Sequence, residues 1–137
     1  MTLSDTSTAG HLISDRLVTT DGSGAPRLLA GRCESCHALS FPRADVCGDC
    51  LSTDIGTIEI ASQGTLYSYS VVHQAPKTWK VPYVLGYVDL PEGLRVLAHI
   101  DAPPSEVAVD AKVKLSLGVV GTDSDGAPLS TYTFVPA

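Results

Sequence analysis

The 137-residue sequence has little positive charge and few aromatic residues. Nine lysines and arginines stand against fifteen aspartates and glutamates, which gives a formal net charge of −6. A protein whose main task is to grip a phosphate backbone needs the opposite balance. We therefore expect no nucleic-acid partner.

Long apolar runs are also missing. A membrane-spanning helix needs about 20 consecutive apolar residues, and no stretch of the sequence approaches that length. Residues 1–27 lack the basic start and the apolar block of a signal peptide. These absences predict no membrane association and a cytoplasmic location, where cysteine thiols stay reduced.

Recognisable catalytic motifs are absent as well. The sequence has four histidines outside any known catalytic pattern: His11, His37, His73 and His99. The Gly-Ser-Gly run at 22–24 is not followed by the Lys-Ser/Thr pair of a phosphate-binding loop. We therefore expect no independent chemistry from this chain, so it is not an enzyme by itself.

What the sequence does have is four cysteines in two close pairs. Two residues separate the members of each pair and ten residues separate the pairs: Cys33 and Cys36, then Cys47 and Cys50. Each pair can turn two thiolates toward one point, and two pairs supply the four soft ligands of a tetrahedral zinc site. We predict structural Zn²⁺ here, in a closed site with no open position for water or substrate.

Three other uses of the cysteines stay open at this point. Two disulfides would each close a small strained ring. A redox-active pair would need a strand–helix context, whereas the surrounding residues are typical of turns. Iron suits four thiolates as well as zinc does, and it would make the chain a red, rubredoxin-like electron carrier.

Patterns along the chain divide it into an arm and two folded units. Residues 1–26 are an N-terminal arm, in which residues 11–18 form either a helical turn or a short strand. Residues 27–55 hold the two cysteine pairs and two short strand-like runs, one leading into the first pair (27–31) and one returning from it (38–42), which predicts a zinc ribbon. Residues 56–137 are rich in strand-like runs, which predicts a small barrel.

The barrel prediction depends on a series of short apolar or alternating runs. These runs are 56–62, 64–73, 83–90, 94–101, 112–118 and 131–134. Residues 91–93 join two of them as a tight hairpin, and residues 103–110 stand where an OB fold carries its helix. The expected fold is mostly β: an N-terminal rubredoxin-like zinc ribbon followed by a small OB-type antiparallel β-barrel.

Some residues in these strands carry further expectations. Strict alternation within 64–73 puts Leu66 on one face of the strand and Val71 on the other. By the same rule, His99 is expected on a polar face. Residues 131–137 either close the barrel or offer an edge that a partner extends.

The segment that follows His73 is the best candidate for a contact site. It carries the only tryptophan, Trp79, between Lys77 and Lys80. In an acidic protein, a lysine pair beside an aromatic side chain suits a phosphate-bearing ligand or a partner protein. The alternative is a stiff loop in which Trp79 caps the end of the barrel and the lysines are only solvated.

The order of short motifs resembles a known family. The motifs are residues 28–37, 41–43, 47–50, 64–67, 71–76, 82–84, 90–93 and 134–137. In this order and spacing they resemble the bacterial and archaeal zinc-ribbon/OB family first catalogued as a domain of unknown function, number thirty-five. The resemblance begins at about residue 27. Residues 1–26 depart from it, because they lack the aromatic residues that members often carry ahead of the ribbon.

The resemblance implies an accessory subunit. Proteins of this family typically pair with a thiolase-fold enzyme, or with a related aldolase or acyltransferase that acts on acyl-CoA. It implies that the four cysteines ligate the metal, that the partner supplies the catalytic groups, and that the complex is a hetero-oligomer. A coenzyme A thioester at the partner interface would bring its phosphates near Lys77 and Lys80.

A second class of function stays open. Zinc ribbons and OB barrels also occur in modules that bind single-stranded nucleic acid, which need a basic groove with exposed aromatic side chains. The barrel strands offer four tyrosines for such a role: Tyr67, Tyr69, Tyr83 and Tyr87. Lysines and arginines are scattered and outnumbered, so the accessory subunit is the preferred interpretation.

Overall fold

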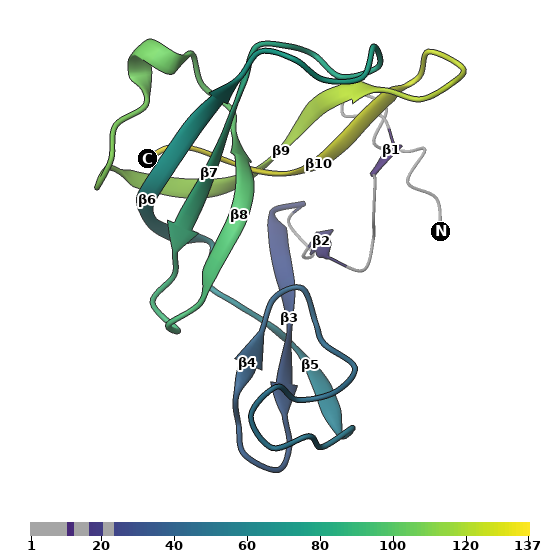
Figure 1. Cartoon of the computed structure of the whole chain (residues 1–137), viewed down its shortest axis with the longest axis vertical. Coiled ribbons are helices and arrows are strands. Elements are labelled where there is room, and N and C mark those ends of the chain that lie inside the picture. Colours follow the sequence, from purple (N-terminus) through teal and green to yellow (C-terminus); the bar gives the residue numbers. More distant parts are fainter. Residues whose placement is uncertain (1–10, 13–16, 21–23) are drawn as a thin grey trace.

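The computed structural model describes residues 11–12, 17–20 and 24–137. Figure 1 shows a small ribbon at one end of the long axis and a barrel at the other. The strands are β1 (His11–Leu12), β2 (Val18–Thr20), β3 (Pro26–Cys33), β4 (Leu39–Ser40), β5 (Ile55–Glu59), β6 (Gln63–Val72), β7 (Tyr83–Asp89), β8 (Arg95–Ile100), β9 (Lys112–Thr122) and β10 (Pro128–Pro136).

Helix is almost absent from the described part of the chain. Its one helical element is the 3₁₀ turn η2 (Pro104–Glu106), between β8 and β9. This turn lies within 103–110, the segment expected at the place of the OB helix. None of the helical structure in the described ranges has the length and apolarity to cross a membrane.

The ribbon sheet is organised around β3, which pairs antiparallel with β2, β4 and β5. The run 56–62 was expected to be the first barrel strand, and this prediction was wrong for its first half. β5 pairs with β3 from Cys33↔Ile55 to Leu29↔Glu59. Side-chain patterns indicate that a strand exists, but they do not reveal which strand it pairs with.

The barrel consists of β6 to β10. The strands follow the order β10-β8-β7-β6-β9, and β9 returns to pair with β10. Within these five strands every pairing is antiparallel except that of β8 with β10, where Thr133 and Phe134 lie beside His99 and Ile100. The last strand therefore closes an OB-type barrel, which is the first of the two roles considered for 131–137. β1 adds a short parallel pairing to β10.

A β-bulge changes which face of the sheet the side chains of β6 point to. Leu66 and Ser68 pair with consecutive residues of β7, which leaves Tyr67 as the extra residue. After the bulge the alternation is shifted by one, so Leu66 and Val71 both pack into the main core. The expectation that they lie on opposite faces was wrong, because a bulge interrupts the period of two.

One strand connects the two units. Leu28 and Ala30 of β3 are fully buried in the main core, together with residues of the barrel. At the other end of the same strand, Cys33 lies in the small ribbon core with Cys47 and Ile55. The position of the ribbon is therefore fixed by packing of β3 into the barrel.

We expect Leu28→Ala to lower the free energy of unfolding by about 3 kcal/mol, because a buried leucine in a packed core leaves a cavity when truncated. Leu51→Ala is the matched control, since Leu51 is 76% exposed, and it should change stability by less than about 0.5 kcal/mol. Urea unfolding of the zinc-loaded protein measures both. Equal losses in the two variants would contradict a shared core.

Candidate functional site

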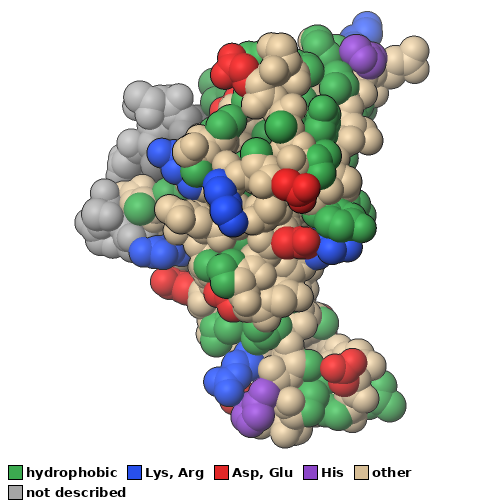
Figure 2. Space-filling model, turned by 90° about the vertical axis from the view of Figure 1, so that its left-hand side faces the viewer, with side chains coloured by type: hydrophobic (Ala, Val, Ile, Leu, Met, Phe, Trp, Pro, Cys, Tyr) green, Lys and Arg blue, Asp and Glu red, His purple; other side chains and the backbone are tan. Residues whose placement is uncertain are grey.

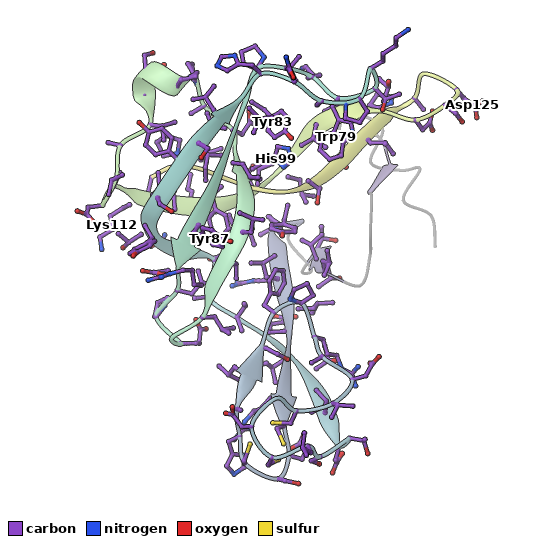
Figure 3. All side chains as sticks on the ribbon, in the orientation of Figure 1. Trp79, Tyr83, Tyr87, His99, Lys112 and Asp125 are labelled. Atoms are coloured by element: carbon purple, nitrogen blue, oxygen red, sulfur yellow. The ribbon has the colours of Figure 1, made fainter. Side chains whose placement is uncertain are left out.

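The four cysteine sulfurs converge at the end of the ribbon, where Figure 3 shows them together in yellow. All four Sγ atoms lie within 4.8 Å of one another. The Sγ–Sγ distance is 3.5 Å for Cys33 and Cys50, and 3.5 Å for Cys36 and Cys47. Zinc–sulfur bonds of about 2.3 Å in a tetrahedron require sulfur separations of about 3.8 Å. The cysteines are therefore positioned to bind a metal ion.

The two cysteine turns are built alike. The residue after each pair, His37 or Leu51, adopts a left-handed conformation, with φ of 66° and 65°. The amide of His37 donates to the carbonyl of Cys33 at 2.8 Å, and the amide of Leu51 donates to the carbonyl of Cys47 at 3.0 Å. Each turn closes on its first cysteine, which directs both thiols of the pair to the same point.

Backbone amides favour the thiolate form of the first cysteine in each turn. The Cys36 amide donates to Cys33 Sγ at 3.5 Å, and this hydrogen bond is the main cause that lowers the pKa of Cys33 to about 6. The amides of Cys50 and Asp49 lower the pKa of Cys47 in the same way. Thiolates are the form that binds metal.

The second cysteine of each turn holds its proton more tightly. For Cys36 an amide hydrogen bond from Ala38 lowers the pKa, but hydrogen bonding with the neighbouring thiols outweighs it and raises the pKa to about 12. The pKa of Cys50 is also raised, against the lowering effect of the Ser52 amide. A bound dication would displace these protons, because metal coordination deprotonates thiols. Four thiolates around one ion make a closed site that stabilises the fold.

The segment that follows His73 crosses the outside of the barrel, and we call residues 73–82 the strap. Trp79 of the strap forms a β-bridge with Gly121 of β9. The Lys80 amide donates to the carbonyl of Val120 at 3.1 Å. A side chain at Gly121 would collide with the carbonyl oxygen of Thr78, so glycine allows the strap to lie flat on β9.

The strap gives its predicted contact residues different environments. Trp79 is half-buried, and its ring stacks on His99 with centroids 5.6 Å apart and an interplanar angle of 15°. Lys80 lines a cavity between the strap and the barrel. His73 and Lys77 are exposed. Trp79 thus packs against β8 and β9, while a ligand or partner contact by these four residues stays a prediction.

His99 lies in a less polar place than its register suggested. Its ring is half-buried between Trp79 and Tyr83, which Figure 3 shows as neighbours. Burial lowers the pKa of His99, and the charge of Asp101 opposes this effect. The expectation of a polar face overlooked that the strap covers this side of β8. The sequence held one sign of this covering, namely Trp79 in the preceding loop, because a tryptophan side chain needs an apolar surface to pack on.

We expect Cys36→Ser to abolish zinc retention and to unfold the ribbon, because metal binding in such units supplies folding free energy on the order of 10 kcal/mol. Ser35→Ala is the control, since it changes the neighbouring side chain and keeps all four ligands. Elemental analysis of the purified proteins measures zinc, and thermal unfolding measures stability. A zinc-free Cys36→Ser protein as stable as the wild type would refute the metal site.

The comparisons with known proteins agree with this architecture. The family model described as the ChsH2 rubredoxin-like zinc ribbon domain matches residues 23–56, and that of the ChsH2 C-terminal OB-fold domain matches residues 57–118. Benzoylsuccinyl-CoA thiolase subunit BbsA of Thauera aromatica is 36% identical, over 80% of this chain and 76% of that protein. A DUF35 domain-containing scaffold protein of Methanocaldococcus jannaschii is 32% identical, over 80% of this chain and 81% of that protein.

Among solved structures, the Ltp2-ChsH2(DUF35) aldolase matches with a TM-score of 0.64 and 32% identity. The match covers 80% of this chain and 84% of that chain. The two family models and the relatives cover most of the chain, from the ribbon into the barrel, and the chain belongs to the DUF35 family of zinc-ribbon/OB-fold proteins.

Proposed function

We propose that this chain is a non-catalytic accessory subunit of a thiolase-like enzyme that acts on acyl-CoA. The observation that carries the proposal is a similarity that extends along most of the chain. The chain is similar to a named subunit of a thiolase, to a named scaffold protein and to a DUF35 aldolase structure. The four cysteines are gathered in the metal cluster, so the catalytic groups would come from the partner.

The outer face of the barrel offers a surface suited to such a partner. Tyr67, Tyr87 and Leu97 are 50%, 44% and 43% exposed, and Tyr87 lies directly beside Leu97 in the β7–β8 register. The Arg95 guanidinium lies 3.5 Å from the centroid of the Tyr67 ring and bonds Asp89 at 2.6 Å. We call these five residues the β6–β8 patch.

The composition of the β6–β8 patch fits a protein interface. Tyrosine and arginine are enriched among the residues that dominate binding energy at interfaces. The two charged side chains of the patch, Asp89 and Arg95, are paired with each other. The hydrogen bond from Arg95 lowers the pKa of Asp89, which keeps its carboxylate ionised, so the two charges cancel. Figure 2 shows acidic and basic side chains interspersed with hydrophobic ones on the face it presents. A patch whose two charges are paired favours apolar contact over attraction of a highly charged ligand.

The strap is the part of the chain that we propose to lie near the coenzyme A phosphates or the partner. His73, Lys77 and Lys80 are exposed on it, and stacking of Trp79 on His99 holds the middle of the strap against the barrel. Lysines on a fixed loop lose less conformational freedom on contact with a phosphate than lysines on a mobile one.

We expect the double variant Lys77→Ala/Lys80→Ala to raise the KM of the complex for acyl-CoA about tenfold at low salt, because charge-assisted contacts to phosphate would be lost. Lys112→Ala/Lys114→Ala is the matched control, since both lysines are exposed on β9 and the same two charges are removed. Steady-state kinetics at two salt concentrations measures the effect. An unchanged KM and unchanged complex formation, or an equal change in the control, would rule out this role.

Affinity purification of the tagged chain from its native cells tests the proposed function itself. We expect one near-stoichiometric thiolase-fold protein by mass spectrometry, and acyl-CoA turnover by the purified pair. Tyr87→Ser should weaken recovery about tenfold, because a central aromatic side chain would leave the interface. Val109→Ser is the control, since Val109 is 52% exposed outside the β6–β8 patch. Recovery of nucleic acid with no such enzyme would overturn the proposal.

A further inference from the structure

The strap and the barrel form the walls of a cavity of about 330 Å³. Lys80 and Pro82 contribute from the strap, and the other walls come from β7, β8, β9, β10 and the segment 101–104 that follows β8. Ligand sites for small organic molecules begin at about this volume. The cavity lies away from the metal cluster, because none of its lining residues belongs to the ribbon.

Two polar atoms in the lining residues lack partners. Nε2 of His99 and Oγ1 of Thr133 are buried without a hydrogen bond to any described residue. The two residues are direct neighbours in the parallel pairing of β8 with β10, and Thr133 is 1% exposed. A buried polar atom without a partner is costly. Because the two residues are neighbours and both line one cavity, these atoms leave hydrogen bonds for an occupant to supply.

The electrostatics of the cavity favour an uncharged occupant. The charged side chains that line it are Lys80 and Asp101, which are opposite in sign. Burial lowers the pKa of His99, which keeps the imidazole neutral at physiological pH and able to accept through one nitrogen. The other walls include Tyr83, Val119 and several prolines. An ion would be attracted by one of the two charged side chains and repelled by the other, so it would lose hydration for little net electrostatic gain.

We propose that this cavity binds a small, uncharged, planar molecule that carries a hydrogen-bond donor and an acceptor side by side, such as an aromatic amide. Its polar group would pair with His99 and Thr133, and its ring would pack against Tyr83 and Val119. The threonine hydroxyl can donate or accept, and a neutral imidazole offers one donor and one acceptor. This inference goes beyond the accessory role, since it concerns the chain without its partner.

Benzamide is the probe, and the zinc-loaded full chain is the protein. Trp79 is the only tryptophan and stacks on His99 beside the cavity, so its fluorescence reports binding. We expect a saturable change with benzamide, and binding at least about tenfold weaker for benzoate and benzylamine, because each brings a charge that one of the two lining charges, Lys80 or Asp101, repels. The absence of a saturable change with benzamide, or tighter binding of either charged analogue, would overturn the proposal.

Thr133→Val removes the hydroxyl and keeps the shape of the side chain. The variant therefore shows whether the hydroxyl serves to bind a ligand or to stabilise the fold. We expect it to weaken benzamide binding about tenfold, while the urea midpoint stays unchanged or rises, because the hydroxyl has no protein partner. Thr133→Ser keeps the hydroxyl and should retain binding. Wild-type affinity in Thr133→Val, or a lower urea midpoint, would show that the hydroxyl serves the fold and overturn the site.

Discussion

The convergence of four cysteine thiols, positioned to bind one metal ion, is the constraint on which the ribbon depends. Its own core consists of Cys33, Cys47 and Ile55, with Ala38 at the margin, and so small an apolar cluster cannot hold a folded unit. The amide donors of the cysteine turns prepare two of the ligands as thiolates. The same strand that ends in Cys33 carries Leu28 into the main core, so order at the metal extends into the barrel.

Local features of this fold could be predicted from the sequence, and long-range ones could not. Cysteine spacing predicted the cluster, and the 91–93 linker predicted the β7–β8 hairpin, since both depend on neighbours in the chain. The partner of β5 and the bulge at Tyr67 depend on tertiary packing that no short pattern encodes. His99 was misread for the same reason, because its environment comes from a loop twenty residues earlier in the chain.

The strap shows how one loop can combine two kinds of role. Its backbone is tied to β9 by the bridge at Gly121, and Trp79 packs on the barrel, so its middle is part of the folded structure. The lysines beside this anchor stay exposed. A rigid support beneath solvent-facing groups is the arrangement that favours binding, because little freedom remains to be lost.

The parallel pairing of β8 with β10 also affects how the chain reaches this fold during synthesis. β10 spans residues 128–136 and supplies Phe134, which is fully buried in the main core. On the ribosome, the ribbon can take up its metal long before β10 emerges, whereas the barrel cannot close until then. Strands β6 to β9 therefore wait with an open edge and exposed core residues, and this nascent intermediate is the stage most exposed to aggregation and most in need of chaperones.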